Sequence, residues 1–162
     1  MSAFDVTLTL HNILRWIVLI AGVLAAGRAI IGWRTDAEWT QLDDRLGLLF
    51  TISFDIQVLL GIVMYLFLSP TTTGAFSDFG AAMGNSEVRF YLVEHSVVML
   101  LALGLAHAGR AAAKGAHATS TRHRRAAIFF TISLILILAL TPWGRPLLRL
   151  GSETVALFSI VG

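Results

Sequence analysis

The chain has 162 residues, of which 56% are hydrophobic and 14% are charged. A soluble domain of this size cannot bury so large an apolar fraction, so the composition predicts an integral membrane protein. The sequence contains no cysteine, which excludes disulfides, thiolate metal sites and covalent haem attachment through a Cys-x-x-Cys-His motif. The formal net charge is only +2, so the balance of charges gives no support to nucleic-acid binding.

Four apolar stretches are long enough to cross a bilayer as helices, which takes about 20 residues at roughly 1.5 Å each. A polar connector follows the first stretch and a basic connector follows the third. The pattern predicts an all-α protein with a single domain, built as an up-and-down bundle of four transmembrane helices. The expected helices cover residues 11–33, 46–68, 88–110 and 124–141.

Three segments lie outside the expected helices. Residues 1–10 form a short polar lead, and residues 69–87 contain Pro70 and three glycines without an apolar period, which predicts a structured loop outside the membrane. Residues 147–162 are expected to form a short tail along the membrane surface. Five aromatic residues cluster at predicted helix ends, as in an interfacial belt: Trp16, Trp33, Tyr65, Tyr91 and Trp143.

The distribution of basic residues predicts the orientation, because Lys and Arg concentrate in loops on the cytoplasmic side. Eight basic residues lie at one end of the expected bundle and four at the other. The chain is therefore expected in a bacterial inner (cytoplasmic) membrane, with both termini on the periplasmic side. The eight are Arg28, Arg34, Arg45, Arg110, Lys114, Arg122, Arg124 and Arg125, and the four are Arg15, Arg89, Arg145 and Arg149.

Several polar and ionisable side chains lie inside or at the ends of the apolar spans. Such groups are costly in lipid unless they face the bundle interior and meet a partner, a metal or a cofactor. They are therefore the candidate functional residues. They are His11 and Arg15 in the first span, Asp55 and Gln57 in the second, Glu94, His95 and His107 in the third, and His123 at the start of the fourth.

His11 and His95 are the strongest candidates for metal ligands. Both are expected towards the outer leaflet, on helices that are diagonal neighbours in an up-and-down bundle. A bis-histidine haem needs two imidazoles that approach the iron from opposite faces, and this pair could provide them.

Two charged residues lie close to these histidines in the sequence. Arg15 follows His11 by one helical turn, so it could neutralise a haem propionate, or it could extend to water as an interfacial anchor. Glu94 points about 100° away from His95, so we expect it to meet Arg89, Arg15 or a proton path.

His107 could serve a second haem. It follows His95 by 12 residues, which is about 18 Å along a helix and a rotation of roughly 120°. A haem in the inner leaflet could be ligated by His107 and His123 on adjacent helices. Alternatively, His107 pairs with Asp55, whose carboxylate could fix a histidine tautomer, carry protons, bind a quinone, or form a buried ion pair that specifies helix register.

Four segments carry a family resemblance: HNILRW, DIQVLLGIVMY, VRFYLVEH followed by HAGR, and RHRRAAIFF. Together they resemble small four-helix bacterial membrane proteins described as cytochrome b-like. The resemblance implies b-type haem and electron transfer with quinone, with His11, His95, His107 and His123 as the matching ligands. The spacing between His95 and His107 is shorter than in larger di-haem cytochromes b, so the number of haems is left as one or two.

Three functions fit these features. The first is an electron carrier that uses one or two b-type haems and exchanges electrons with quinone or a periplasmic redox partner. The second is a non-catalytic accessory subunit of a larger membrane complex, in which the polar residues only fix helix packing. The third is a small proton-coupled transporter using Asp55 and Glu94, which is disfavoured because the spans lack the paired Gly and Pro interruptions of such folds.

Overall fold

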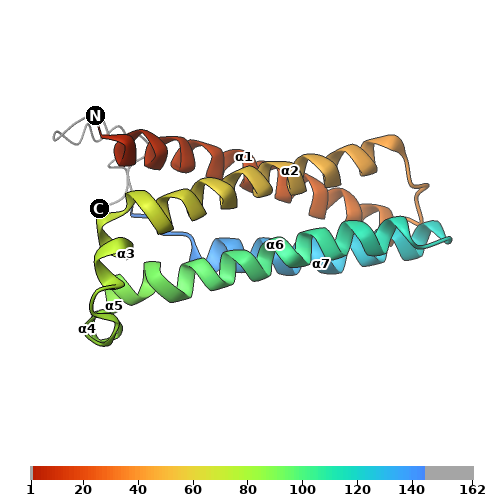
Figure 1. Ribbon diagram of the computed structural model, residues 1–162. Coiled ribbons are helices and arrows are strands. Elements are labelled where there is room, and N and C mark those ends of the chain that lie inside the picture. Colours follow the sequence, from red (N-terminus) through yellow and green to blue (C-terminus); the bar gives the residue numbers. More distant parts are fainter. Residues whose placement is uncertain (1, 145–162) are drawn as a thin grey trace.

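The computed structural model describes residues 2–144, which fold into a bundle of long helices without a strand in that range (Figure 1). Four helical spans are long and apolar enough to cross a membrane. These observations confirm the predicted all-α, four-helix architecture of a multi-pass membrane protein. The expected surface tail at 147–162 lies outside the described residues.

The four spans are built from α-helices and two π-helical turns. The first span is α1 (Ala3–Arg34), and the second is α2 (Gln41–Val63) continued by the π turn η1 (Met64–Leu68). The third consists of α5 (Ser86–Arg89), the π turn η2 (Phe90–Glu94) and α6 (His95–Lys114), and the fourth is α7 (Thr119–Leu140).

All four spans begin earlier than predicted, and polar residues cap the starts of the first two. At the start of α1, the Asp5 N–H donates to Ser2 Oγ and the Ser2 N–H donates to Asp5 Oδ2, each at 3.1 Å. This reciprocal box satisfies backbone donors that a helix start otherwise leaves open. The Thr40 N–H likewise donates to Asp43 Oδ2 at 2.7 Å, so α2 begins at Gln41. The predicted start of the first helix at residue 11, after a polar lead at 1–10, is therefore wrong, because α1 begins at Ala3.

The segment predicted as a loop, 69–87, folds largely into two short helices, α3 (Pro70–Ala75) and α4 (Phe79–Gly84). Each begins at a side-chain cap: Ser69 Oγ accepts from the Thr72 N–H at 3.4 Å, and Asp78 Oδ1 accepts from the Ala81 N–H at 3.0 Å. Buried side chains from both helices cluster with Leu92 of η2. The segment therefore covers one end of the bundle (Figure 1).

The spans pack as a ring. α1 lies against α2 and α7, and α6 lies against α7 and α2, so α1 and α6 are diagonal, as predicted. The α1–α2 and α6–α7 connectors lie at the same end of the bundle, and the start of α1 lies at the other end with α3 to α5 (Figure 1). We call the half near the connectors the closed half and the half near α3 to α5 the open half.

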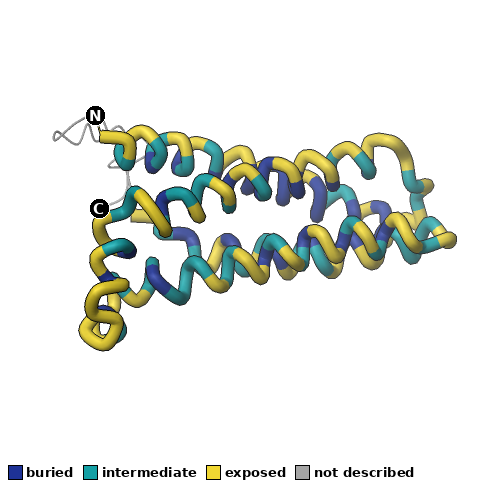
Figure 2. Tube along the Cα trace, viewed as in Figure 1, coloured by how far each residue is buried: buried dark blue, intermediate teal, exposed yellow. Residues whose placement is uncertain are grey.

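Small side chains hold the closed half together. Ala102, Ala106 and Ala126 are fully buried, and Ser133 Oγ donates to the Ala102 carbonyl at 2.7 Å, which joins α7 to α6. Small residues let helix axes approach closely and leave backbone atoms of one helix against the next. The buried residues lie mainly on the inward faces of the spans (Figure 2).

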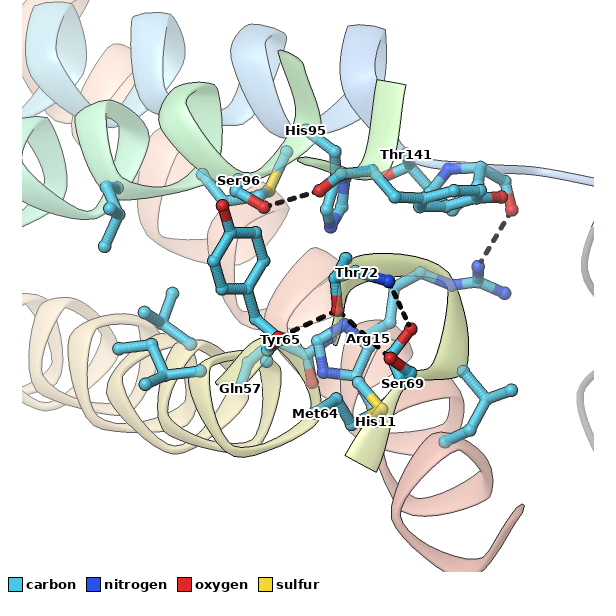
Figure 3. Close-up of a pocket in the computed structure, with 18 of the residues that line it drawn as sticks. His11, Arg15, Gln57, Met64, Tyr65, Ser69, Thr72, His95, Ser96 and Thr141 are labelled. Carbon is cyan, nitrogen blue, oxygen red and sulfur yellow. Dashed lines mark hydrogen bonds between the residues drawn. The ribbon is translucent and has the colours of Figure 1, made fainter. Parts of the chain in front are cut away.

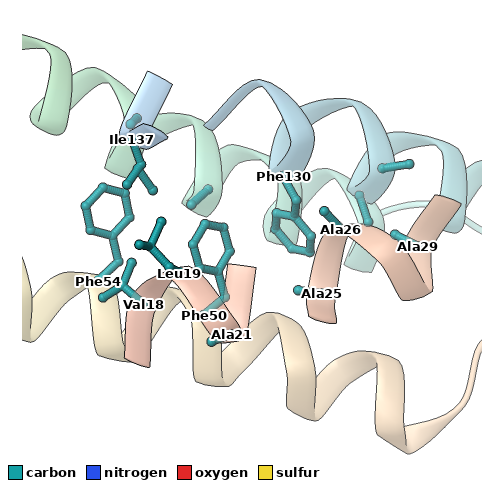
Figure 4. Close-up of a cluster of buried hydrophobic side chains, with 14 of the residues drawn as sticks. Val18, Leu19, Ala21, Ala25, Ala26, Ala29, Phe50, Phe54, Phe130 and Ile137 are labelled. Carbon is teal, nitrogen blue, oxygen red and sulfur yellow. The ribbon is translucent and has the colours of Figure 1, made fainter. Parts of the chain in front are cut away.

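Aromatic side chains fill the centre of the bundle. Phe50 and Phe130 meet edge to face with ring centroids 5.6 Å apart, and Phe50 stacks near Phe54 at 6.0 Å. Both Phe50 and Phe54 are at most 1% exposed. These rings, which lie between α1, α2 and α7, form the boundary between the closed half and the space on the other side (Figure 4).

Gly109 tests the close packing of α6 on α7. A Cβ at this position would lie 2.5 Å from Phe129 Cβ, an atom fixed by the backbone of α7. We expect Gly109→Ala to lower the free energy of unfolding by about 1–3 kcal/mol through overpacking. Thermal unfolding in detergent, followed by circular dichroism, measures the change.

The matched control is Gly27→Ala, because a Cβ at Gly27 meets nothing within 4 Å. Alanine in an open helical position is neutral or stabilises by about 0.5–1 kcal/mol. Equal stabilities of the two variants would contradict the packing described for Gly109.

Candidate functional site

The open half contains a cavity of about 420 Å³ between the four spans and α3. Cofactor and ligand pockets commonly have volumes of roughly 300–1,000 Å³ and mostly apolar walls with a few polar groups. This cavity has that character (Figure 3). Its polar lining residues are His11, Asn12, Arg15, Gln57, Tyr65, Ser69, Thr71, Thr72, Tyr91, His95, Ser96 and Thr141.

The structure brings His11 and His95 to the same cavity. His95 points into it from α6, and His11 lies on the side formed by α1 (Figure 3). Gly61 of α2 lies beside His11, since a Cβ at Gly61 would be 3.4 Å from the His11 Cε1. The two histidines therefore come from diagonal helices and share one interior space.

A hydrogen bond orients the His95 ring. His95 Nδ1 lies 2.8 Å from the Leu140 carbonyl oxygen, which can only accept, so we place the hydrogen on Nδ1. In a neutral ring this leaves the lone pair on Nε2. An outer hydrogen bond of this kind commonly fixes the tautomer and orientation of a metal-binding histidine.

Arg15 is buried in the cavity wall with only part of its hydrogen-bonding capacity used. The residue is 8% exposed, and its Nη1 donates to the Pro142 carbonyl at 3.3 Å. Its guanidinium carbon lies 5.6 Å from the centroid of Trp16 and 5.9 Å from that of Trp143. Among the described residues, the buried Nε has no hydrogen-bond partner. Arg15 therefore does not extend to water as an anchor and can receive an anionic or carbonyl oxygen.

The two π-helical turns border the cavity. Residues of η1 and η2 line it, and Tyr65 Oη of η1 donates to the Leu92 carbonyl of η2 at 3.0 Å. Thr72 Oγ1 of α3 donates to the Tyr65 carbonyl at 2.8 Å. A π turn adds a residue to the helical repeat, which rotates the following side chains around the helix, and such turns are frequent at functional sites. The η2 turn immediately precedes His95.

Glu94 faces away from the cavity lining. Its Oε1 accepts from Arg89 Nε at 2.9 Å, and both side chains are more than two-fifths exposed. Arg89 was one of the partners expected for Glu94. The ion pair therefore belongs to the outer surface near η2.

His107 pairs with Asp55, which was the alternative to haem ligation. His107 Nε2 lies 2.8 Å from Asp55 Oδ1, and the side chains are 49% and 45% exposed. The pair joins α6 to α2 on the outside of the bundle, so it is not the buried ion pair considered from the sequence. Gln57, two residues further along α2, is instead buried and lines the cavity.

His123 lies in a different interface from His107. It is fully buried, and its ring centroid is 4.8 Å from that of Trp39 in the connector. It also fills the space beside Gly32 of α1, where a Cβ would be 2.4 Å from the His123 Cε1. The structure therefore does not bring His107 and His123 together as the ligand pair expected for a second haem.

Several lining residues had no distinctive signal in the sequence. Tyr65 and Tyr91 fitted an interfacial belt, and Asn12, Thr72 and Ser96 are ordinary polar residues near helix ends. Asn12 has the one signal that was available, because it adjoins His11 and precedes Arg15 by less than one turn. The others reach the cavity through the π turns and the fold of α3.

Fold and site define a class of protein: a four-span, multi-pass membrane protein with an interior cavity bearing two histidines and an arginine. No family model, curated protein or solved structure matched the chain. Within residues 2–144, no group of three or more His, Asp or Glu side chains is placed to hold a bare metal ion. A bis-histidine haem requires only two protein ligands.

His123 tests whether a buried histidine acts in packing. We expect His123→Ala to lower the free energy of unfolding by about 2–5 kcal/mol, the range for large core side chains cut to alanine. Chemical or thermal unfolding in detergent measures this change.

The same substitution at His117, which is exposed in the α6–α7 connector, serves as the control. Surface changes of this kind usually stay within about 0.5 kcal/mol. A stability of His123→Ala equal to that of His117→Ala would contradict the packing role.

Proposed function

We propose that the protein is a membrane b-type cytochrome that holds one haem b in the cavity and exchanges electrons with a quinone. The observation that carries this proposal is the meeting of His11 and His95, from diagonal helices, in one mostly apolar interior cavity. We do not propose a second haem, because His107 pairs with Asp55 and His123 packs against Trp39.

The residues in the cavity suit a haem. The imidazoles of His11 and His95 would hold the haem iron, and the Leu140 carbonyl orients the ring of His95. The apolar walls suit the macrocycle, and the buried Nε of Arg15, which has no partner within residues 2–144, could donate to an acidic substituent. When bound, haem supplies one-electron transfer. His11 and His95 would hold it, and the positive charge of Arg15 would favour the electron-rich form.

The walls of the cavity also support quinone as the redox partner. Ile62 of α2 and Val97 and Leu100 of α6 line the cavity and are each more than two-fifths exposed on the bundle surface. The cavity therefore reaches the outside between α2 and α6, at a depth where the surroundings of a membrane protein are apolar. A lipid-soluble electron carrier could approach there without crossing water.

The proposed placement is a bacterial inner membrane with the open half towards the periplasm. Its basis is the excess of Lys and Arg at the connector end. A periplasmic redox partner would then meet the surface formed by α3 to α5.

An accessory subunit of a larger membrane complex is the second candidate. The observation that favours it is the Asp55–His107 pair, which is half exposed within the spans and would face lipid in a lone chain. This candidate predicts a colourless protein that copurifies with other subunits.

Visible absorption of purified protein tests the proposal. We expect a Soret band and a reducible α-band of a low-spin haem, and we expect His11→Ala and His95→Ala each to lose the low-spin spectrum because an axial ligand is removed. His117→Ala, in the exposed connector, should retain the wild-type spectrum. A protein that stays colourless after expression with excess haem would exclude the proposal.

Arg15 tests the electrostatics of the same cavity. Its positive charge favours the reduced haem, so Arg15→Leu should lower the reduction potential by tens of millivolts, where 59 mV is a tenfold change in a one-electron equilibrium. Arg15→Lys retains the charge and should show a smaller shift. Redox titration of the α-band measures both, and an unchanged potential in Arg15→Leu would place the guanidinium away from the haem.

A further inference from the structure

One face of α6 has no neighbour in the part of the chain that the structure describes. Gly104, His107, Ala108 and Ala111 recur at helical spacing and are all exposed. Of the apolar window of this span only 11% is buried, compared with 44% in the first span. Figure 2 shows the same contrast along the two helices. We call these four residues, with Asp55 of α2, the α6 face.

The centre of the α6 face is shaped for another helix. Gly104 and Ala108 are one turn apart, and a Cβ at Gly104 would meet nothing within 4 Å. Small residues four apart let two membrane helices approach until their backbones touch. A stripe of small residues alone does not show what binds to this face. The Asp55–His107 pair beside it gives a second observation on the chemistry of the partner.

The Asp55–His107 pair supplies that second observation. The two side chains are 2.8 Å apart and about half exposed. Asp55 lies near the middle of the span Gln41–Leu68, between the exposed apolar residues Ile52 and Ile56. A carboxylate and an imidazole that faced lipid there would be unfavourable, and polar groups within membrane spans usually meet a protein partner. The pair therefore favours a protein partner that places polar groups against the α6 face.

We propose that a second copy of this chain docks on the α6 face and forms a symmetric dimer. A two-fold axis along the membrane normal places every residue opposite the same depth of the other copy. Asp55 and His107 share one depth because they are hydrogen-bonded, so the pair of one copy meets the pair of the other.

The polar groups of the Asp55–His107 pair match those of the same pair in a symmetry-related copy. The bond uses Asp55 Oδ1 and His107 Nε2, which leaves Oδ2 and Nδ1 outside it. Across the two-fold axis, His107 Nδ1 of each copy faces Asp55 Oδ2 of the other. The two antiparallel pairs place each imidazole beside the carboxylate of the other copy, whereas a purely apolar helix would offer no polar group to Oδ2 and Nδ1. A second copy therefore fits this face better than lipid.

The α6 face is distinct from the cavity. Gly104, His107, Ala108, Ala111 and Asp55 are not among the cavity-lining residues. The dimer therefore goes beyond the proposed function and does not depend on haem binding. Its test can fail while the absorption spectrum stays that of a cytochrome, and the reverse is equally possible.

Crosslinking in membranes tests the proposal without dissolving the dimer. The chain contains no cysteine, so each introduced cysteine is unique. We expect Ala108→Cys to form a disulfide-linked dimer on mild oxidation, because residues near a two-fold axis meet their own copy. Leu24→Cys, on the exposed side of α1, should stay monomeric under the same conditions. The readout is the mass of the purified, tagged chain on a non-reducing gel.

A second variant measures the affinity. Gly104→Leu should weaken the dimer by at least tenfold, measured as a dissociation constant from dilution in mild detergent with light scattering. Gly27→Leu is the matched control, because Gly27 also has no atom within 4 Å of its Cβ position but lies on α1. Helical ellipticity of both variants verifies that each has folded.

Three results would overturn the proposal. The first is a wild-type chain that stays monomeric in membranes and gives no Ala108→Cys crosslink. The second is a crosslink from Ala108→Cys to a different protein only, which would identify a foreign subunit as the occupant. The third is a dimer that links through Leu24→Cys or survives Gly104→Leu unchanged, which would place the interface on another face.

Discussion

Close packing of small residues in one half of the bundle is the constraint on which the rest of the structure depends. Ala25, Ala102, Ala106 and Ala126 are at most 3% exposed and draw the helices together. In the other half the four spans enclose a cavity of about 420 Å³ instead of a continuous core. The phenylalanines at the centre separate the two regions, because a ring such as that of Phe54 packs against the core and also forms the cavity wall.

The surroundings of each polar group in the spans depend on whether it lies in the open half or in the closed half. In the open half, His11, His95 and Arg15 all line the cavity. In the closed half the described residues leave a pocket of only about 10 Å³, and neither His107 nor His123 lines it. His123 becomes a packing residue beside Trp39, whereas His107 is directed outward to Asp55. Location within the bundle, more than residue type, therefore decides which histidines are candidates for ligation.

The proposed cytochrome rests on the polar groups that face the cavity, and the proposed dimer rests on the polar groups that face outward. Polar side chains that line a mostly apolar interior cavity fit a bound cofactor, because ligand sites commonly combine apolar walls with a few placed polar groups. Outward polar groups in a span predict a protein neighbour, because contact with lipid is unfavourable for them. On translocon insertion scales, an Asp at the centre of a helix costs about 2.5–3.5 kcal/mol of insertion free energy. The exposed residues that line the cavity on α2 and α6 differ from those of the α6 face, so the proposed access of a lipid-soluble partner and the proposed contact with a second copy involve different residues of these two helices.

The sequence by itself determined the helical class, the number of spans and their approximate positions, because these depend on hydrophobicity along the chain. It also indicated His11 and His95 as a pair, since alternating helix directions put them at one end. Capping extended α1 and α2 beyond their apolar stretches, and only coordinates revealed it because Ser2 and Thr40 look like ordinary polar residues. The π turns, the separation of His107 from His123 and the outward position of Asp55 were decided by tertiary structure. The physical reason is that rotation of a helix about its axis is set by packing against its neighbours, and hydropathy does not encode that rotation.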